Sequence, residues 1–254
     1  MKLTAVARRR GEVLWFFVAA LCFVSLALFA QTTKPPSLDE IVSRHLQARG
    51  GAEKLKALQS LRTVGTLSLG SRGQAQLTRE IKRPHLARTD FVLGGATLVH
   101  AYDGQSGWQI GPDGKTAELT GDNLKNAQED ADIEGPLIDY KQKGNKVEMA
   151  GTSSVNDAAC YNLKLTYANG DVAYICVDAK TYLVVGQRVE RNGQVQVEAV
   201  LGDYRPYGGI QFAGSSDIKQ AGNPEPIHYK LEKVEINPEI DDSRFRKPPS
   251  QEPQ

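Results

Sequence analysis

The sequence predicts an α+β fold dominated by one antiparallel sheet. Short segments of alternating apolar and polar residues recur from residue 63 onward, and Gly, Asn and Asp turn signals separate them. Within 195–201, apolar side chains alternate with polar neighbours, which indicates a sheet with one buried face. Residues 121–144 interrupt this pattern. The expected strands are 63–69, 73–82, 86–93, 96–102, 107–110, 115–119, 145–151, 159–167, 172–178, 182–190, 195–203, 209–218 and 227–236.

Residues 1–30 are expected to be an export signal peptide and are excluded from the fold. A basic start is followed by a run from 13 to 30 that is apolar apart from one serine. We expect cleavage after Ala27 or Ala30. The apolar run also reaches the lower limit for a membrane-spanning helix, so an uncleaved inner-membrane anchor is the alternative.

Two helices are expected between the leader and the first strand. Residues 31–36 form a linker, and Ser37 followed by Glu40 is a capping box that begins the first helix. This helix ends at the pair Gly50–Gly51, and 52–61 is expected to be a second, short helix. The apolar residues at helical spacing in the first helix are Leu38, Ile41, Val42 and Leu46.

The interruption at 121–144 is expected to be helical. Residues 123–131 permit a helix but are mostly polar, and 135–140 has the apolar content of a second short helix. Such an insert can cover the open face of a curved sheet. The tail, 247–254, is rich in proline and polar residues and is expected to be disordered.

The turn at Asn192–Gly193 tests the strand register. Leu183, Val185 and Val189 share the apolar face of 195–201 only if this loop has an odd number of residues. We therefore expect a bulged turn in which Gly193 takes the left-handed conformation.

Cys160 and Cys176 flank a turn that contains Asn169–Gly170. A two-residue loop would place the two thiols on opposite faces of the hairpin. An odd-length loop would place them on one face but diagonally, beyond ideal bridging geometry. The sequence therefore predicts two unbridged thiols.

The charge balance argues against nucleic acid as a partner. Removing the four basic residues and one acidic residue of 1–30 from the totals of 31 and 30 leaves 27 basic and 29 acidic residues. The remaining chain is thus close to neutral, without the density of basic side chains that several phosphates require.

Residues 81–108 contain a strand end and a tight turn. Pro84 has no amide hydrogen and ends the strand that precedes it, and Asp103–Gly104 supplies a tight turn. Because successive strand residues point to opposite sides, four side chains share one face. These are Leu77, Arg79, Ile81 and Arg83.

These features resemble the LolA/LolB superfamily, the periplasmic carrier and the outer-membrane receptor of bacterial lipoproteins. The shared pattern is an Arg-Pro pair that ends a strand, an Asp-Gly turn, a Trp shortly after it, and a helical stretch around a Pro-Leu pair. In this chain the pattern reads Arg83–Pro84, Asp103–Gly104, Trp108 and Pro136–Leu137. The resemblance rests on their order and spacing, and it implies an incomplete (half) β-barrel, residues 37–246, covered by a few helices.

The resemblance also implies a lipid-binding site. In the carrier family the arginine before this proline faces the cavity and donates hydrogen bonds to lid elements in the closed form. Arg83 would then hold shut a lid formed by 136–138 and the first helix; alternatively, it extends from the strand end into water. The expected ligand-binding residues are Arg83, Leu77, Ile81, Trp108, Pro136, Leu137 and Ile138. Aromatic residues are few, so the ligand is a different lipid or the protein's own side chains fill the cavity.

The residues do not indicate an enzyme, a cofactor or a metal site. The histidines His45, His85, His100 and His228 are scattered, and no cysteine stands at metal-ligand spacing from them. The sequence has no nucleophile elbow, phosphate loop or dinucleotide motif. A hydrolase assembled from distant residues is the least favoured reading.

We therefore expect a periplasmic protein, not an enzyme, that binds lipid or lipoprotein acyl chains in a hydrophobic cavity and transfers them. Cys22 follows the bulky Leu21, which spoils a lipidation site and favours a soluble carrier over an anchored receptor. Expected partners are the lipoprotein machinery of the inner and outer membranes, with the protein itself a monomer. The alternative is an envelope sensor or interaction module of the same fold that carries no cargo.

Overall fold

One open antiparallel sheet of 13 strands organises residues 60–236. The structure is a computed structural model that describes residues 34–249, so the expected export signal and the last five residues of the expected tail lie outside the described residues. In chain order the strands are β1 (Ser60–Ser68), β2 (Gln74–Lys82), β3 (Leu86–Leu93), β4 (Ala96–Tyr102), β5 (Gly107–Ile110), β6 (Thr116–Glu118), β7 (Lys146–Val155), β8 (Ala158–Thr166), β9 (Val172–Asp178), β10 (Val184–Arg191), β11 (Gln194–Gly202), β14 (Ser215–Gln220) and β15 (Ile227–Ile236).

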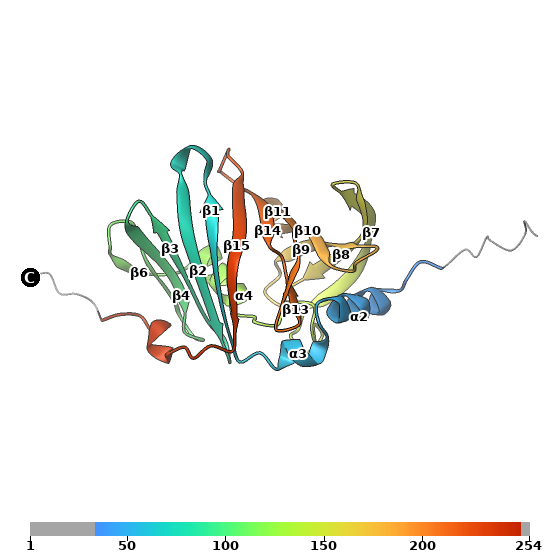
Figure 1. Cartoon of the computed structure of the whole chain (residues 1–254), viewed down its shortest axis with the longest axis horizontal. Coiled ribbons are helices and arrows are strands. Elements are labelled where there is room, and N and C mark those ends of the chain that lie inside the picture. Colours follow the sequence, from blue (N-terminus) through green and yellow to red (C-terminus); the bar gives the residue numbers. More distant parts are fainter. Residues whose placement is uncertain (1–33, 250–254) are drawn as a thin grey trace, which may run out of the picture. The chain divides into compact units, whose positions relative to one another are not determined.

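The last strand joins the two halves of the sheet. The strand order is β6-β5-β4-β3-β2-β1-β15-β14-β11-β10-β9-β8-β7, so β15 lies between the first half (β1–β6) and the second half (β7–β11 and β14). Figure 1 shows β15, in orange-red, beside β1, in cyan, although they are far apart in the chain. The edge strands β6 and β7 do not pair, so the sheet is an incomplete barrel. This confirms the expected fold class.

Three helices cover one face of the sheet, which we call the inner face. They are α2 (Leu38–Ala48), α3 (Ala52–Lys56) and α4 (Gly121–Asp130), and short 3₁₀ turns lie at Gly70–Arg72 and Asp242–Arg244. The helix α2 begins as expected, because the Ser37 hydroxyl accepts a hydrogen bond from the Glu40 amide at 3.2 Å. No helix within 34–249 combines the length and apolarity that crossing a bilayer requires.

Apolar clusters attach the helices to the two halves of the sheet. Ile41 and Val42 of α2 pack on the second half, against Leu163, Leu165 and Ile175. Leu55 of α3, with the residues that follow it, packs on the first half. A smaller cluster joins α4 to β3 and β4 through Ala127, Ala87 and Tyr102. The inner face is therefore covered in sections.

Two expected helices differ in the structure. The second helix ends at Lys56 instead of reaching residue 61, because β1 begins at Ser60 and Leu61 pairs with Ile81 and Ile236. Residues 135–140 form turns, not a helix: Pro136 offers no amide hydrogen, and Asp139 has a φ of 47°. Strand pairing and backbone geometry outweigh the helical spacing in these segments.

The expected strand 209–218 is also divided. Its first part forms β13 (Ile210–Phe212), which pairs with β12 (Arg205–Tyr207) in a separate two-stranded sheet. Its second part is β14. The break lies at Gly214, whose amide donates to Gly202 and Asp203 carbonyls instead of continuing the ladder. The small hairpin leaves the main sheet at this point.

The turn at Asn192–Gly193 differs in one respect from the expected one. Arg191 pairs with Gln194, so the loop has two residues, both with positive φ (49° and 71°). Gly193 is left-handed, as expected. The extra residue lies in the ladder instead, as a bulge after Val189, which pairs with Val197. The extra residue that keeps the apolar side chains of the two strands on one face therefore lies within the strand pairing and not in the loop.

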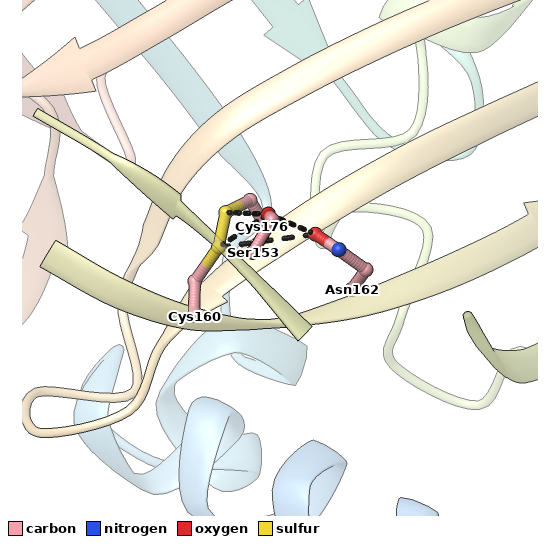
Figure 2. Close-up of a disulfide and its surroundings, with 4 residues drawn as sticks. All are labelled: Ser153, Cys160, Asn162 and Cys176. Atoms are coloured by element: carbon pink, nitrogen blue, oxygen red, sulfur yellow. Dashed lines mark hydrogen bonds between the residues drawn. A yellow bond between two sulfur atoms is a disulfide. The ribbon is translucent and has the colours of Figure 1, made fainter. Parts of the chain in front are cut away.

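Cys160 and Cys176 form a disulfide, so the prediction of two unbridged thiols is wrong. The Tyr167 amide donates to the Asp171 carbonyl, which leaves a three-residue loop and puts both cysteines on one face. Cys160 lies opposite Asp178, two residues from Cys176, yet the Cα atoms are 5.5 Å apart. Sheet twist shortens one of the two diagonals between paired strands, and this distance is within the bridging range. Figure 2 shows the bridge beside Ser153 and Asn162.

Candidate functional site

Three neighbouring cavities lie between the inner face of the sheet and the helices. The central cavity has a volume of about 410 Å³, the α4 cavity about 420 Å³ and the α2 cavity about 240 Å³. Gln187 of β10 borders all three. The inner face is thus not packed solid. Volumes of 300–1,000 Å³ are typical of small-molecule sites.

The walls of these cavities combine apolar and charged side chains. The central cavity is lined by Leu61, Ile81, Ile133, Arg79, Asp130 and Tyr167, among others. The α4 cavity is lined by Phe91, Val189, Thr89, His100 and Asn126, and the α2 cavity by Leu46, Leu137, Ile175, Val184 and Tyr204. Such walls suit an amphiphile better than a bare hydrocarbon.

The helix α4 is attached to both halves of the sheet by ion pairs. On the first half, Arg79 of β2 lies 2.8 Å from the Asp130 carboxylate and also donates to the Asp130 carbonyl at 3.0 Å. On the second half, Arg191 of β10 donates to Asn126 at 2.7 Å and lies 3.4 Å from Glu129. The only buried residue of α4 is Ala127. Polar contacts therefore hold this helix over the sheet.

A buried ion pair within the second half of the sheet lies where α4 meets it. The Arg191 side chain is 4% exposed and pairs with Asp171 at 2.8 Å, and Lys125 of α4 reaches the same carboxylate at 3.0 Å. Burial alone would raise the pKa of Asp171, but hydrogen bonds from Lys125 and Arg191 outweigh it and the pKa is lowered. Burial raises the pKa of Glu129, and Arg191 opposes this only in part. The cluster therefore holds its charges through mutual contact.

Arg83 connects the end of β2 to two covering segments. Its Nε donates to the carbonyl of Leu58, in the α3–β1 connection, at 2.6 Å, and its Nη2 donates to the carbonyl of Lys56, the last residue of α3, at 3.1 Å. Nη2 also pairs with the carboxylate of Glu134. Glu134 belongs to the segment 132–144, which we call the lid segment because it crosses the cavities after α4. Arg83 is thus bonded to helix-end carbonyls and to the lid segment at once.

The lid segment has its own polar attachments. Lys143 lies 2.7 Å from Asp132 and donates to the Gly135 carbonyl at 2.9 Å, so it closes the segment on itself. Lys56 of α3 pairs with Asp139 at 2.5 Å. Pro136 borders two cavities, and Leu137 and Ile138 are buried in the clusters around α2 and α3. These three expected site residues therefore lie between the helices and the cavities.

Most of the expected ligand-binding residues share the inner face. Directly opposed residues on neighbouring strands point to the same side, and Leu61, Ile81, Ala87 and Tyr102 form one such row. Ile81 borders the central cavity. Leu77 and Arg83 lie an even number of residues away on the same strand or its end, so they belong to this side. Leu77 is half-buried and borders none of the three cavities.

Trp108 is separated from the others, which corrects its expected place in the ligand pocket. It pairs with Ala101, which continues a row through Arg88 and Glu80 on the opposite, outer face. The ring is 1% exposed and its Nε1 donates to the Phe245 carbonyl at 2.7 Å. Trp108 therefore packs beneath the C-terminal segment. The number of residues in the Asp103–Gly104 turn decides which face Trp108 occupies, because it pairs Tyr102 with Gly107 and Ala101 with Trp108. The residue types alone do not reveal this face.

Other residues of the site carried no signal in the sequence. Arg49 and Gln187 border the cavities, and Arg191 and Asp130 attach α4, but none belongs to a motif. Gln187 is a polar residue in an apolar row, opposite Ile175 and Ala199. Such an exception to an alternating pattern was the one available sign of a functional position.

A buried histidine and a half-buried tyrosine stabilise the wall around α2. His45 Nδ1 donates to the Tyr182 carbonyl at 2.9 Å, and burial lowers the pKa of His45 to about 4, so the ring is neutral near pH 7. The Tyr204 hydroxyl donates to the Val184 carbonyl at 2.7 Å, and burial raises its pKa to about 12. Within 34–249, the acidic, histidine and cysteine side chains form no cluster suited to a metal ion.

The outer face of the second half carries a groove of about 670 Å³, which is larger than each of the three inner cavities. It lies beside the disulfide and is bordered by Tyr174, Arg188, Glu198 and Lys219. Arg188 lies over the Tyr174 ring at 4.4 Å. This groove opens on the side of the sheet opposite to the three cavities, so it is a separate surface.

Comparison with known proteins places the fold. No family model matches the sequence, and no curated protein matches it. Among solved structures, a DUF1329 family protein from Desulfovibrio piger aligns with a TM-score of 0.58 at 11% identity, over 82% of this chain and 96% of that one. A LolA superfamily protein from Nitrosomonas europaea aligns with a TM-score of 0.57 at 12% identity, over 84% and 98%.

A third similar structure is a domain named for outer membrane lipoprotein sorting, from Vibrio parahaemolyticus. Its TM-score is 0.51 at 11% identity, over 80% of this chain and 97% of that one. These proteins are similar in fold across nearly their whole length. The chain therefore adopts a LolA/LolB-like fold, as the sequence pattern around Arg83 indicated.

Proposed function

We propose that this protein binds a lipid, or the acyl chains of a lipoprotein, in the three inner cavities and transfers it between membranes of the bacterial envelope. One observation carries the proposal: the inner face is hollow beneath α4, and this helix is held mainly by ion pairs of its residues Lys125, Glu129 and Asp130 with the sheet. Ion pairs can exchange their partners for water, whereas a packed apolar seam cannot open without exposing its surface. The proposed role is binding, not catalysis.

Burial of acyl chains would supply the affinity. Each methylene transferred from water gains about 0.8 kcal/mol, so one chain suffices for useful binding. Apolar wall residues lie in each cavity, for example Ile81, Phe91 and Leu137. The acyl chains would occupy one of the adjoining cavities, or several together when α4 moves away from the sheet.

Arg83 would couple lipid entry to movement of the lid segment. Its bonds to Glu134 and to the carbonyls of Leu58 and Lys56 agree with the closed arrangement that the LolA/LolB resemblance implies. Charge-assisted hydrogen bonds of this kind are stronger than neutral ones. A lipid that displaces the lid segment must break them, and their re-formation would favour release.

The proposal includes export to the periplasm, with 1–30 as the signal or, alternatively, as an inner-membrane anchor. The Cys160–Cys176 disulfide supports an oxidising compartment, because such bridges persist there and are rare in the cytosol. Lipoprotein machinery at either membrane would then be the partner.

The test is mass spectrometry of an organic extract of the protein, purified gently from its own host without detergent. We expect a lipid or lipopeptide at a stoichiometry near one. The double variant Arg79→Gln/Arg191→Gln, in which these two attachments of α4 are removed, should retain less lipid when it is purified in the same way. A repeatedly empty wild-type protein would contradict lipid carriage.

A second test addresses transfer. Arg83→Leu should fold and bind lipid but release it slowly, because the bonds that reclose the lid segment are gone. Lys82→Leu is the matched control: Lys82 is the neighbouring cation, and it bonds to Ile240 and Asp242 on the outer side. Transfer from loaded protein to acceptor vesicles measures the difference. Equal rates for Arg83→Leu and wild type would exclude the coupling.

A second candidate function is an interaction module of the same fold. The observation that favours it is the outer groove of about 670 Å³, which is larger than any of the inner cavities and lies away from them. This candidate would be favoured over lipid carriage if the protein is purified without lipid and binds a specific partner protein, and if that binding depends on Arg188 and Lys219 of the groove.

A further inference from the structure

The position of Arg49 is fixed by the backbone. It caps the C-terminal end of α2, and its carbonyl accepts a hydrogen bond from the Gln211 amide at 2.9 Å. Gly50 follows with a φ of 121°, and a Cβ there would lie 2.2 Å from the Gly209 carbonyl oxygen. The chain therefore passes close to the β12–β13 hairpin and presents the Arg49 side chain in one direction.

That direction is inward. The Arg49 side chain borders both the α2 cavity and the central cavity. Its Nη1 makes one long hydrogen bond, 3.4 Å, to the Glu134 carbonyl. A Cβ added at Gly135 would lie only 3.3 Å from this Nη1, so the guanidinium lies close to the lid segment. Burial lowers the pKa of Arg49, but a guanidinium remains charged at neutral pH.

Arg49 has no carboxylate partner within 4.0 Å among residues 34–249. The acidic groups around it already pair with other cations. Glu134 binds Arg83 and Lys143, and Asp132 binds Lys143. Farther along the central cavity, Asp130 pairs with Arg79, and Glu129 with Arg191. One half-buried cation at the cavity wall is therefore left without an ion-pair partner in the described residues, an arrangement that costs free energy unless a ligand supplies the anion.

Gln187 adds a neutral donor at the same place. It projects from the inner row between Ile175 and Ala199 and borders all three cavities. Its amide has no hydrogen-bond partner in the part of the chain that the structure describes, whereas its strand neighbour Arg188 pairs with Glu190 on the outer face. A free polar group in an apolar row that borders the cavities is available to orient a ligand there.

We infer that Arg49, with Gln187, binds the anionic group of an amphiphile whose hydrocarbon part lies in the inner cavities. The inference rests on the proposed function and narrows it to ligands with a carboxylate or a phosphate ester. A guanidinium binds either group through two parallel hydrogen bonds, and the Gln187 amide supplies a further one. The adjoining cavities then accommodate the chain.

The experiment uses protein expressed from the full-length sequence, delipidated, and loaded with the neutral fluorescent probe N-phenyl-1-naphthylamine. Palmitate, methyl palmitate and 1-palmitoyl lysophosphatidate compete for the probe below their micelle concentrations. We expect one or both anionic ligands to compete at least about tenfold better than the methyl ester, because hydrogen bonds to charged groups contribute that much. The better of the two anions identifies carboxylate or phosphate as the source.

Variants separate the anchor from general binding. Arg49→Gln should abolish the preference for the anions while methyl palmitate competes as before, and Arg49→Lys should restore most of it. Gln187→Leu should reduce the preference about threefold. The control is Arg44→Gln, an exposed arginine of the same helix that pairs with Glu40, which should change nothing.

Two results would overturn the inference. Equal competition by all three ligands in the wild type, which needs no variant, would show that no anionic group is bound. An anion preference that survives in Arg49→Gln would show that another residue binds it. If neither the probe nor any of the three ligands binds the wild type, the proposed function itself fails and the anchor fails with it.

Discussion

The helices α2 and α4 both lie on the inner face, but different forces attach them. α2 buries Ile41 and Val42 in the cluster on the second half of the sheet, and Ile41 is fully buried. α4 buries only Ala127 and depends on Arg79 and Arg191. Helices attached by apolar side chains cannot detach without exposing them to water, while ion pairs can be hydrated. In the proposed function, α2 is therefore a fixed wall and α4 a removable cover.

The largest effect should come from removing apolar contacts of the two helices in turn. Ile41→Ala should cost about 2–5 kcal/mol of unfolding free energy, because it leaves a cavity in a packed cluster. Leu124→Ala, the matched truncation on α4, should cost less than about 1 kcal/mol, because Leu124 is only partly buried. Urea unfolding monitored by circular dichroism measures both. Equal costs would remove the distinction between wall and cover.

A pH series should show a somewhat smaller effect that belongs to α2. The pKa of His45 is about 4 in the folded protein and ordinarily about 6.5, so the unfolded chain binds the proton first as pH falls. Stability is therefore complete above about pH 6.5 and is lost as pH falls toward 4, by about 3 kcal/mol.

The variant His45→Gln stays neutral, so its stability should lack this part of the pH dependence. His228→Gln, at an exposed histidine paired with Asp217, is the control. Unfolding free energies of the three proteins at pH 7, 6, 5 and 4 give the difference. A wild-type slope equal to that of His45→Gln would mean that the neutral His45 ring does not support the wall.

The smallest effect on global stability should come from the ion pairs of α4, although their local effect is large. Arg191→Gln removes the contacts of the guanidinium with Asn126 and Glu129 of α4 and leaves Asp171 with Lys125 as its one ion-pair partner, so amide exchange within 121–130 should be about 100-fold faster if the helix opens by itself. Arg79→Gln breaks a half-exposed pair and should accelerate this exchange only about threefold. Hydrogen exchange with mass spectrometry reports each segment separately.

The same measurement has an internal control in α2. Amides of 38–48 should exchange at the wild-type rate in both variants, since no ion pair joins that helix to the sheet in the described structure. Faster exchange in both helices, with a matching loss of global stability, would show that the two helices open together.

The expected strands agree closely with the observed ones, for a physical reason. Short apolar segments and the turn residues between them are local properties, and for 86–93 and 107–110 the expected bounds are the observed ones. The capped start of α2 is equally local. Where segments disagree, as at 52–61 and 135–140, pairing with distant strands or a backbone constraint outweighs the apolar spacing.

The sequence by itself determined the strands, the first helix, and the shared face of Leu77, Ile81 and Arg83, because each depends on neighbours along the chain. Only the tertiary structure decided the disulfide, the outer place of Trp108 and the inward aim of Arg49. These depend on loop parity, sheet twist and the return of β15 to β1, which bring together residues far apart in the chain. Patterns among neighbouring residues do not show which distant residues meet in the folded protein.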